Sequence, residues 1–295
     1  MTIFKLNSQF WSRLLLLPAI LATLVFVYAF ILWTVGISFT PSSLVPRWEW
    51  NGFAQYLRLI QQERFQVSMS NLLLFCAFSV PLTGLLGLGL AILLDQKIRA
   101  EGLFRTIYLY PMALSFIVTG TAWKWLLNPE IGIQAIVRDL GWSGFEFDWM
   151  SNPERALYCV VIASIWQSTG FAMALFLAGI RAIDAQVISA ARIDGAKSWT
   201  LYRRVVLPML RPVFLSVGVI LANSAIKTFD LVLALTGGGP GFSSDLPALY
   251  MVVHAFQRSQ LGLAAASATV IFVLLMLVLI PHLRRELRSL SGGTR

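Results

Sequence analysis

Six long, mostly apolar segments dominate this chain and constrain its fold more than any other feature. They lie at residues 14–39, 71–94, 105–127, 157–180, 213–235 and 263–282. Each has about the 20 residues that an α-helix needs to cross roughly 30 Å of hydrocarbon. The hydrophobic share of 57% also exceeds the roughly 45–50% of soluble domains. The sequence therefore predicts an all-α, polytopic membrane protein with about six transmembrane helices, in a single transmembrane domain over residues 1–295.

The basic residues between these segments predict an orientation. Both termini and the connections after the second and fourth segments carry the larger share: Lys5, Arg13, Lys97, Arg99, Arg105, Arg181, Arg192, Lys197, Arg203, Arg204, Arg211, Arg284, Arg285, Arg288 and Arg295. The remaining connections carry Arg47, Arg58, Arg64, Arg138, Arg155 and Arg258. Because short cytoplasmic loops are enriched in Lys and Arg, both termini are predicted to be cytoplasmic. The net charge of +9 then reflects topology, so no nucleic-acid partner is expected.

The sequence lacks the motifs of several common catalytic and metal-binding sites. The chain has no G-x-x-x-x-G-K-[ST] phosphate loop, no G-x-S-x-G and no H-E-x-x-H, so no catalytic residue is predicted. His254 and His282 are isolated, and no metal site is expected. Cys76 and Cys159 lie inside apolar segments and are interpreted as small buried hydrophobes.

The connection at residues 181–211 is predicted to be the longest cytoplasmic one, and it is patterned. Asp184 can cap a helix over residues 185–193, and Gly195 can end it in the left-handed conformation. A second amphipathic stretch at residues 199–206 leads to Leu207-Pro208, and Pro208 and Pro212 should stop it before the fifth segment begins.

The predicted helix over residues 185–193 combines small side chains with apolar ones. Ala190 and Ala191 allow close approach of a partner, and Val187, Ile188 and Ile193 are apolar. Apolar side chains that would otherwise be exposed to water suggest that this helix docks onto a partner protein. An amphipathic helix that lies on the lipid surface is the alternative, and these residues alone do not decide between them.

The same connection resembles a loop of ABC-importer permeases that reads E-A-A, three residues, Gly, nine residues, then I-x-L-P. This chain has Ser189-Ala190-Ala191, then Gly195 preceded by Asp194, and finally Val205-Val206-Leu207-Pro208. The spacing matches throughout. Ser189 replaces the family's glutamate and Val205 its isoleucine, which puts one ion pair with the ATPase subunit in doubt.

Further stretches are similar to the maltose-porter and glycerol-phosphate-porter type of sugar permease. They are Lys227-Thr228-Phe229-Asp230, the run Leu235-Thr236-Gly237-Gly238-Gly239-Pro240, residues 166–171 and residues 128–132. Residues 243–248 are similar to glucose and mannose porters.

This resemblance implies an inner-membrane permease of a bacterial importer that moves a mono- or oligosaccharide, for example of the glucose/mannose type, by alternating access. It implies a second homologous permease, two ATPase subunits and a periplasmic or lipid-anchored sugar-binding protein as partners, besides membrane lipid. The ATPase would use ATP and Mg, and no cofactor is expected on this chain. The residues implied in ATPase coupling are Ser189, Ala190, Ala191, Asp194, Gly195, Leu207 and Pro208.

Polar residues inside the predicted helices are candidates for the sugar path. Lys227 and Asp230 are three residues apart, so on one helix they would share a face and could pair. Asn223 and Gln167 can bond to hydroxyls, and Phe229 and Trp166 can stack on a sugar ring. The alternatives are a structural ion pair, polar contacts between helices, and packing. A different class, an ion-coupled secondary transporter or channel, is disfavoured because no internal repeat is evident.

Overall fold

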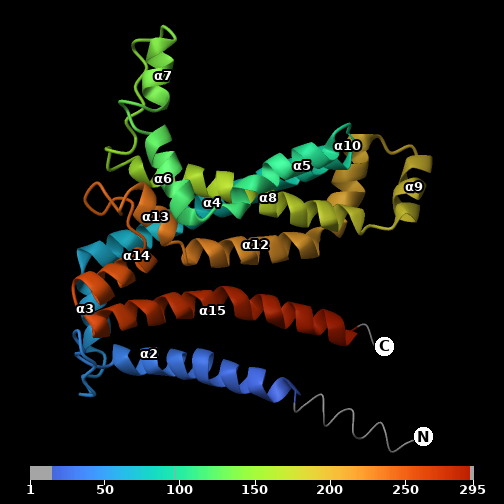
Figure 1. Ribbon diagram of the computed structural model, residues 1–295. Helices are drawn as coiled ribbons and strands as arrows, with labels where there is room; N and C mark the ends of the chain where they lie inside the picture. Colours follow the sequence, from blue (N-terminus) through green and yellow to red (C-terminus); the bar gives the residue numbers. More distant parts are fainter. Residues whose placement is uncertain (1–14, 97, 293–295) are drawn as a thin grey trace, which may run out of the picture. The chain divides into compact units, whose positions relative to one another are not determined.

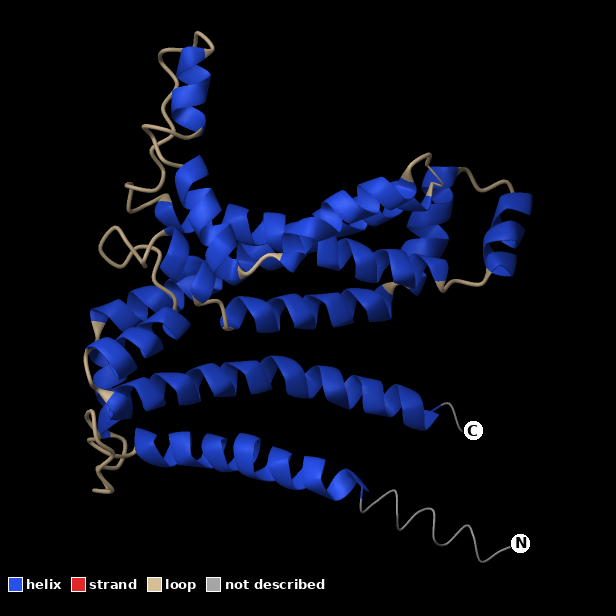
Figure 2. Cartoon of the chain, viewed as in Figure 1, coloured by secondary structure: helices blue, strands red, loops and turns tan. Residues whose placement is uncertain are grey.

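Helices are the regular secondary structure of the described part of the protein. The structure is a computed structural model that describes residues 15–96 and 98–292. Within these residues it contains helices and loops but no strand (Figure 2). Lys5, Arg13, Lys97 and Arg295, which entered the orientation argument, lie outside the described residues.

Four helices are long and apolar enough to cross a membrane: Leu15–Ser38, Glu63–Asp95, Ala156–Arg181 and Leu261–Arg285. Two bent pairs, Glu101–Ala113 with Phe116–Leu126 and Ser198–Met209 with Arg211–Ile226, bring the number to six if each pair is one span. The predicted all-α fold with about six spans is therefore confirmed, although two of the spans are broken.

Figure 1 shows the order of the elements along the chain. The first part contains the π-helical stretch η1 (Leu24–Ala29), α2 (Phe30–Ser38), α3 (Ala54–Gln61), α4 (Glu63–Asp95), α5 (Glu101–Leu109), the 3₁₀ turn η2 (Tyr110–Ala113), α6 (Phe116–Leu126) and α7 (Ile133–Asp139). The second part contains α8 (Ala156–Arg181), α9 (Ala185–Ile193), α10 (Ser198–Leu201), the π-helical η3 (Tyr202–Val206), α11 (Leu207–Met209), α12 (Arg211–Ile226), α13 (Asp230–Leu235), α14 (Pro247–Val252), the π-helical η4 (Val253–Gln257) and α15 (Leu261–Gly292).

The chain forms two compact units. The first comprises Met1–Gln61 and Met251–Val270. Inside it, the Gly262 N–H donates to the Ser42 carbonyl at 2.9 Å. A Cβ at Gly262 would lie 2.3 Å from the Thr40 carbonyl oxygen, so only glycine allows this approach. The start of α15 is thereby fixed to the loop that follows α2.

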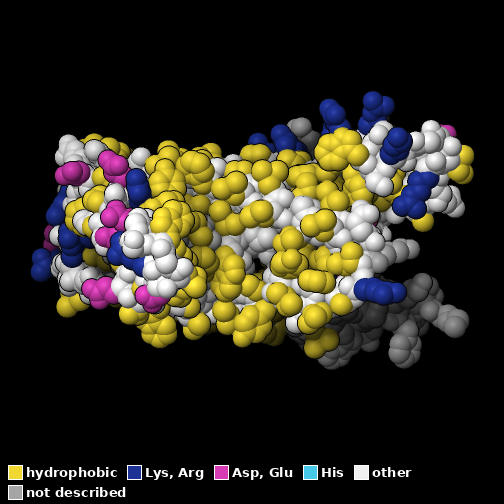
Figure 3. All heavy atoms as spheres, turned by 90° about the horizontal axis from the view of Figure 1, so that it is seen from above, with side chains coloured by type: hydrophobic (Ala, Val, Ile, Leu, Met, Phe, Trp, Pro, Cys, Tyr) yellow, Lys and Arg dark blue, Asp and Glu magenta, His cyan; other side chains and the backbone are white. Residues whose placement is uncertain are grey.

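The second unit comprises Gln62–Tyr250 and Ile271–Arg295, and its centre is the contact of α4 with α8 and α12. A Cβ on Gly87 of α4 would lie 2.6 Å from the Ala172 Cβ of α8, so the two helices cross very closely. Figure 1 shows α4, α5, α8 and α12 running in a similar direction, with α9 beyond one end. In Figure 3, hydrophobic side chains cover the middle of the visible face, and charged side chains lie at its two ends.

The prediction of one continuous helix over residues 105–127 was wrong. α6 leaves the direction of the preceding helix by 100°. Pro111 lies in the 3₁₀ turn η2, Leu114 is extended, and the Ser115 hydroxyl accepts from the Val118 N–H to start α6 afresh. The Gln167 side chain of α8 donates to the Leu114 carbonyl at 2.8 Å and so gives this backbone group a partner at the break.

The prediction of one continuous helix over residues 213–235 was also wrong. α12 ends at Ile226, and α13 begins only at Asp230. A Cβ on Gly120 of α6 would lie 2.7 Å from the Ala234 Cβ and 3.0 Å from the Leu231 carbonyl oxygen. Close packing of α13 on α6 therefore redirects the chain, although no proline or glycine marks the break in the sequence.

Candidate functional site

The helix α9 forms where its sequence predicts and is capped at both ends. The Asp184 carboxylate accepts from the Gln186 N–H at 2.8 Å, and Gly195 has a φ of +83° just after the last turn. Because L-side chains rarely adopt that conformation, Gly195 ends the helix. The Ser189 hydroxyl donates to the Ala185 carbonyl at 2.8 Å, so this side chain is satisfied within its own helix.

One face of α9 packs inward and the other is exposed. Ile188 and Ala191 pack against the hydrophobic core of the second unit. Ile193 is 86% exposed, and Val187, Ser189, Ala190 and Asp194 also lie on the surface. The expectation of three exposed apolar residues thus holds for Val187 and Ile193, while Ile188 is half-buried.

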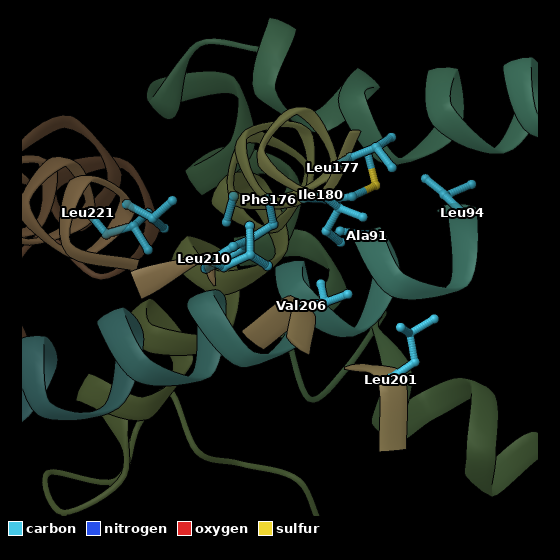
Figure 4. Close-up of a cluster of buried hydrophobic side chains, with 12 residues drawn as sticks. Ala91, Leu94, Phe176, Leu177, Ile180, Leu201, Val206, Leu210 and Leu221 are labelled. Carbon is cyan, nitrogen blue, oxygen red and sulfur yellow. The ribbon is translucent and has the colours of Figure 1, made fainter. Parts of the chain in front are cut away.

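The arm that leads from α9 to α12 is anchored in the same core. Leu201, Val206 and Leu210 are buried and share a cluster with Ala91 and Leu94 of α4, and Figure 4 shows all five around the arm.

The arm stops before α12, as expected from Pro208 and Pro212. The helical path continues through Pro208 to Met209 and bends by 66° before Arg211. The π turn of η3 precedes the proline and accommodates its missing N–H. Leu207 is half-buried and Pro208 is exposed.

A cavity of about 670 Å³ gathers four of the six predicted path residues. Its lining is Phe116, Val219, Ile220, Asn223, Ser224, Lys227, Thr228, Phe229, Asp230, Leu279, His282 and Leu283. Aromatic faces, hydroxyls, an amide, an amine and a carboxylate thus meet in one space, which suits a polar organic ligand with apolar ring faces. The sequence pattern missed Phe116 and His282, which come from other helices than the motif.

The predicted pairing of Lys227 with Asp230 on one helix face was wrong. Lys227 caps the end of α12 and Asp230 begins α13. Within the described ranges the ion pairs formed are Arg64 with Asp245 and Arg181 with Glu101. Lys227 and Asp230 instead meet as parts of one cavity wall.

Gln167 and Trp166 lie outside this cavity. Gln167 lines a smaller cavity of about 190 Å³, which shares Phe116, Ile220 and Ser224 with the larger one. Trp166 packs edge-to-face on Trp123 at 5.9 Å between ring centroids, which is the packing alternative. Among the described residues no cluster of His, Cys, Asp or Glu could hold a metal ion.

Residues 84–289 match the family of binding-protein-dependent transport system inner membrane components. The chain belongs to this family. A probable ABC transporter permease protein of Pyrococcus horikoshii is 42% identical over 92% of this chain and 93% of its own length. The xylose/arabinose import permease protein XacH of Haloferax volcanii is 34% identical, covering 98% of this chain and 90% of the relative.

Two further comparisons concern another relative and the fold. The trehalose/maltose transport system permease protein MalF of Thermococcus litoralis is 30% identical over 92% of each chain. The crystal structure of a bacterial ABC transporter involved in the import of the acidic polysaccharide alginate contains a chain with a TM-score of 0.80 and 22% identity. The match covers 95% of this chain and 97% of the chain in the alginate transporter, so the two share one fold.

In this permease the glycine-rich loop after α13 is held by contacts that sequence analysis missed. Arg64 Nε lies 2.6 Å from Asp245 Oδ2, with the two side chains 11% and 0% exposed. The Asn71 side-chain amide donates to the carbonyls of Ser243 and Asp245 at 3.0 Å each, and to that of Phe242 at 3.3 Å. The Arg64 guanidinium also lies 4.7 Å from the centroid of the Phe242 ring. This set, named the loop lock, fixes residues 236–246 to the start of α4.

Proposed function

We propose that this permease carries a mono- or oligosaccharide across the membrane by alternating access. The names of relatives support a sugar, since XacH imports xylose or arabinose and MalF transports trehalose or maltose. The cavity supports it too, because Phe116 and Phe229 offer ring faces while Asn223 and Lys227 offer hydrogen-bond donors. Glucose/mannose-type selectivity stays a prediction, and its residues Ser244 and Asp245 are buried in the loop lock region.

The partners follow from the family, whose description names a binding protein and a transport system. We infer a second homologous permease, two ATPase subunits and a periplasmic or lipid-anchored sugar-binding protein. A solved bacterial alginate ABC transporter is in complex with an alginate pentasaccharide-bound periplasmic protein. The ATPase subunits would use ATP and Mg, while this chain binds neither and performs no covalent chemistry. The proposed setting is the bacterial inner membrane, with both termini and the loop 181–211 in the cytoplasm.

The observation that carries this proposal is the geometry of α9. A short helix capped by Asp184 and ended by Gly195 presents an exposed face of small and apolar side chains, Ala190 and Ile193 among them. Its opposite face packs on the core of the second unit. Such a helix can enter a cleft of an ATPase subunit and move with it, while the inward face passes the displacement to the spans. Two discrete states whose balance ATP shifts are then sufficient for alternating access.

Purification of the native complex tests the proposal. We expect an ATP-hydrolysing subunit, a second permease and a binding protein to co-purify, and a sugar to be identified by mass spectrometry in the binding protein. A cysteine placed at Ile193 should cross-link to the ATPase subunit, whereas one placed at Trp142, exposed in the loop after α7, should not. Both positions are exposed, so they form a matched pair.

Two results would contradict the proposal. One is a complex in which the Ile193 cysteine reaches no nucleotide-hydrolysing subunit. The other is uptake that stops when the ion gradient is dissipated while ATP remains high, which is the behaviour of the ion-coupled secondary transporter or channel.

A further inference from the structure

Both arms of the segment that carries α9 are fastened by polar contacts to one place, the junction of α4 and α5. The arm that follows α9 contacts Asp95 and Gln96, at the end of α4. The arm that precedes α9 contacts Glu101, in the first turn of α5. Two contacts on opposite sides of α9 therefore converge on a very short stretch of the chain.

The contact on the following arm is a hydroxyl network. The Tyr202 hydroxyl donates to Asp95 Oδ2 at 2.7 Å, and it accepts from the Gln96 side-chain amide at 2.9 Å. The hydroxyl is thus used both as donor and as acceptor. Tyr202 stands at the first position of η3, between the buried side chains of Leu201 and Val206.

One feature of this contact is unfavourable for the isolated helix. Asp95 places a carboxylate at the C-terminus of a 33-residue helix, where the helix dipole disfavours negative charge. The hydrogen bond to Tyr202 gives the misplaced carboxylate a donor.

The contact on the preceding arm is an ion pair. Arg181 Nη2, at the end of α8, lies 2.6 Å from Glu101 Oε1. Both charges suit their helix ends, since Arg181 is at a C-terminus and Glu101 at an N-terminus. The Arg181 side chain is 43% exposed and that of Glu101 is 29% exposed. The pair therefore adds little to stability, and its effect is to hold the end of α8 beside the start of α5.

The junction leads from these contacts to the cavity. α5 packs tightly on α8, because a Cβ at Gly170 would lie only 1.9 Å from the Tyr108 carbonyl oxygen. After the bend at Leu114, α6 begins with Phe116, which lines the large cavity. α5 and α6 therefore form a packed, continuous connection between the junction and the cavity wall.

We propose that Tyr202 and Arg181 are positioning residues that transmit the displacement of α9 to the junction of α4 and α5, and through α5 to the cavity. Neither side chain lines the large cavity. The inference rests on the proposed function, since it assumes that an ATPase moves α9. It adds a defined route, which the resemblance of the α9 loop alone does not give.

The test measures how strongly ATP changes the accessibility of the cavity in the full complex. A cysteine replaces Thr228, which lines the cavity, and a membrane-impermeant maleimide reports its labelling rate with and without ATP and Mg. ATPase activity is measured on the same samples. We expect Tyr202→Phe to reduce the ATP-dependent change in labelling at least about fivefold, because the hydrogen bonds to both Asp95 and Gln96 are lost. The ATPase activity should stay within about twofold, because the docking face of α9 is unaltered.

A matched control is Tyr56→Phe. Tyr56 also makes a partly buried hydroxyl contact, with the Ser38 hydroxyl at 2.6 Å, but in the first unit. The Tyr56→Phe variant should leave the ATP-dependent labelling unchanged. Asp95→Asn keeps an acceptor for the Tyr202 hydroxyl and should retain most of the response, whereas Asp95→Ala should lose it. A merely structural role would lower ATPase activity and labelling together, in proportion to the amount of complex.

A charge swap tests the other arm and does not depend on how Tyr202→Phe folds. Arg181→Glu and Glu101→Arg should each reduce the response about two- to fivefold, as expected for a partly exposed ion pair. The double variant should restore part of it, because the pair is rebuilt although both charges then oppose their helix dipoles.

The outcomes separate this inference from the proposed function. Normal ATP-dependent labelling in both Tyr202→Phe and the single charge variants would overturn the inference and leave the proposed function intact. A wild-type complex with no ATPase subunit and no response to ATP would overturn both.

Discussion

The loop lock should govern the local stability of the glycine-rich loop, and Asp245→Ala is the sharpest perturbation. Asp245 is fully buried and Arg64 is 11% exposed, with Nε to Oδ2 at 2.6 Å. Removing one partner of a buried pair leaves the other charge desolvated, at a cost of about 3–5 kcal/mol. Because about 1.4 kcal/mol corresponds to a factor of ten, opening of the loop should become about 10²- to 10³-fold more frequent.

Hydrogen exchange measures this opening in the intact complex. The amides of Ser244 and Asp245 donate to the carbonyls of Gly238 and Phe242 at 3.2 and 3.1 Å, so they are protected only while the loop is closed. Peptides that cover residues 236–246 should exchange faster in Asp245→Ala by the factor given above.

A control variant and a double variant isolate the contribution of the buried ion pair. Asp148→Ala removes an exposed aspartate from the loop after α7 and should leave exchange over residues 236–246 unchanged. Replacing both partners, Arg64→Met with Asp245→Leu, should restore protection to within about tenfold of wild type, because an apolar pair replaces a buried ionic one at little cost. Equal exchange in Asp245→Ala and Asp148→Ala would refute the idea that the lock holds the loop.

Three further outcomes are expected. Gly170→Ala should prevent normal assembly, because its Cβ would meet a backbone carbonyl oxygen at 1.9 Å, whereas Gly84→Ala, with no atom within 4 Å of its Cβ, should assemble normally; size-exclusion chromatography of the complexes compares them. Gly195→Ala should destabilise the end of α9 by about 1 kcal/mol, since φ is +83°, and should speed local hydrogen exchange about fivefold without lowering expression. Replacing Lys227 and Asp230 together by alanine should reduce uptake of radiolabelled maltose or xylose at least about tenfold while ATPase activity persists, as expected for lost charged contacts to a ligand, and unchanged uptake would assign both residues a structural role.

Local patterns in the sequence were sufficient for the elements whose causes are local. Long apolar runs predicted the spans, because crossing a membrane demands length and hydrophobicity wherever the neighbours lie. Asp184 and Gly195 predicted both ends of α9, because a cap acts on backbone groups a few residues away.

Contacts between distant segments decided the rest. The break at Leu114 depends on Gln167, which is 53 residues away, and the break before Asp230 depends on close packing against Gly120. Arg64 and Asp245 are 181 residues apart, so no local pattern pairs them. Periodicity and capping describe one segment at a time, whereas these breaks, the cavity and the loop lock arise from which segments the fold brings together. The sequence therefore determined which segments form helices and how α9 is capped. The tertiary structure decided where the bent spans break and which side chains meet.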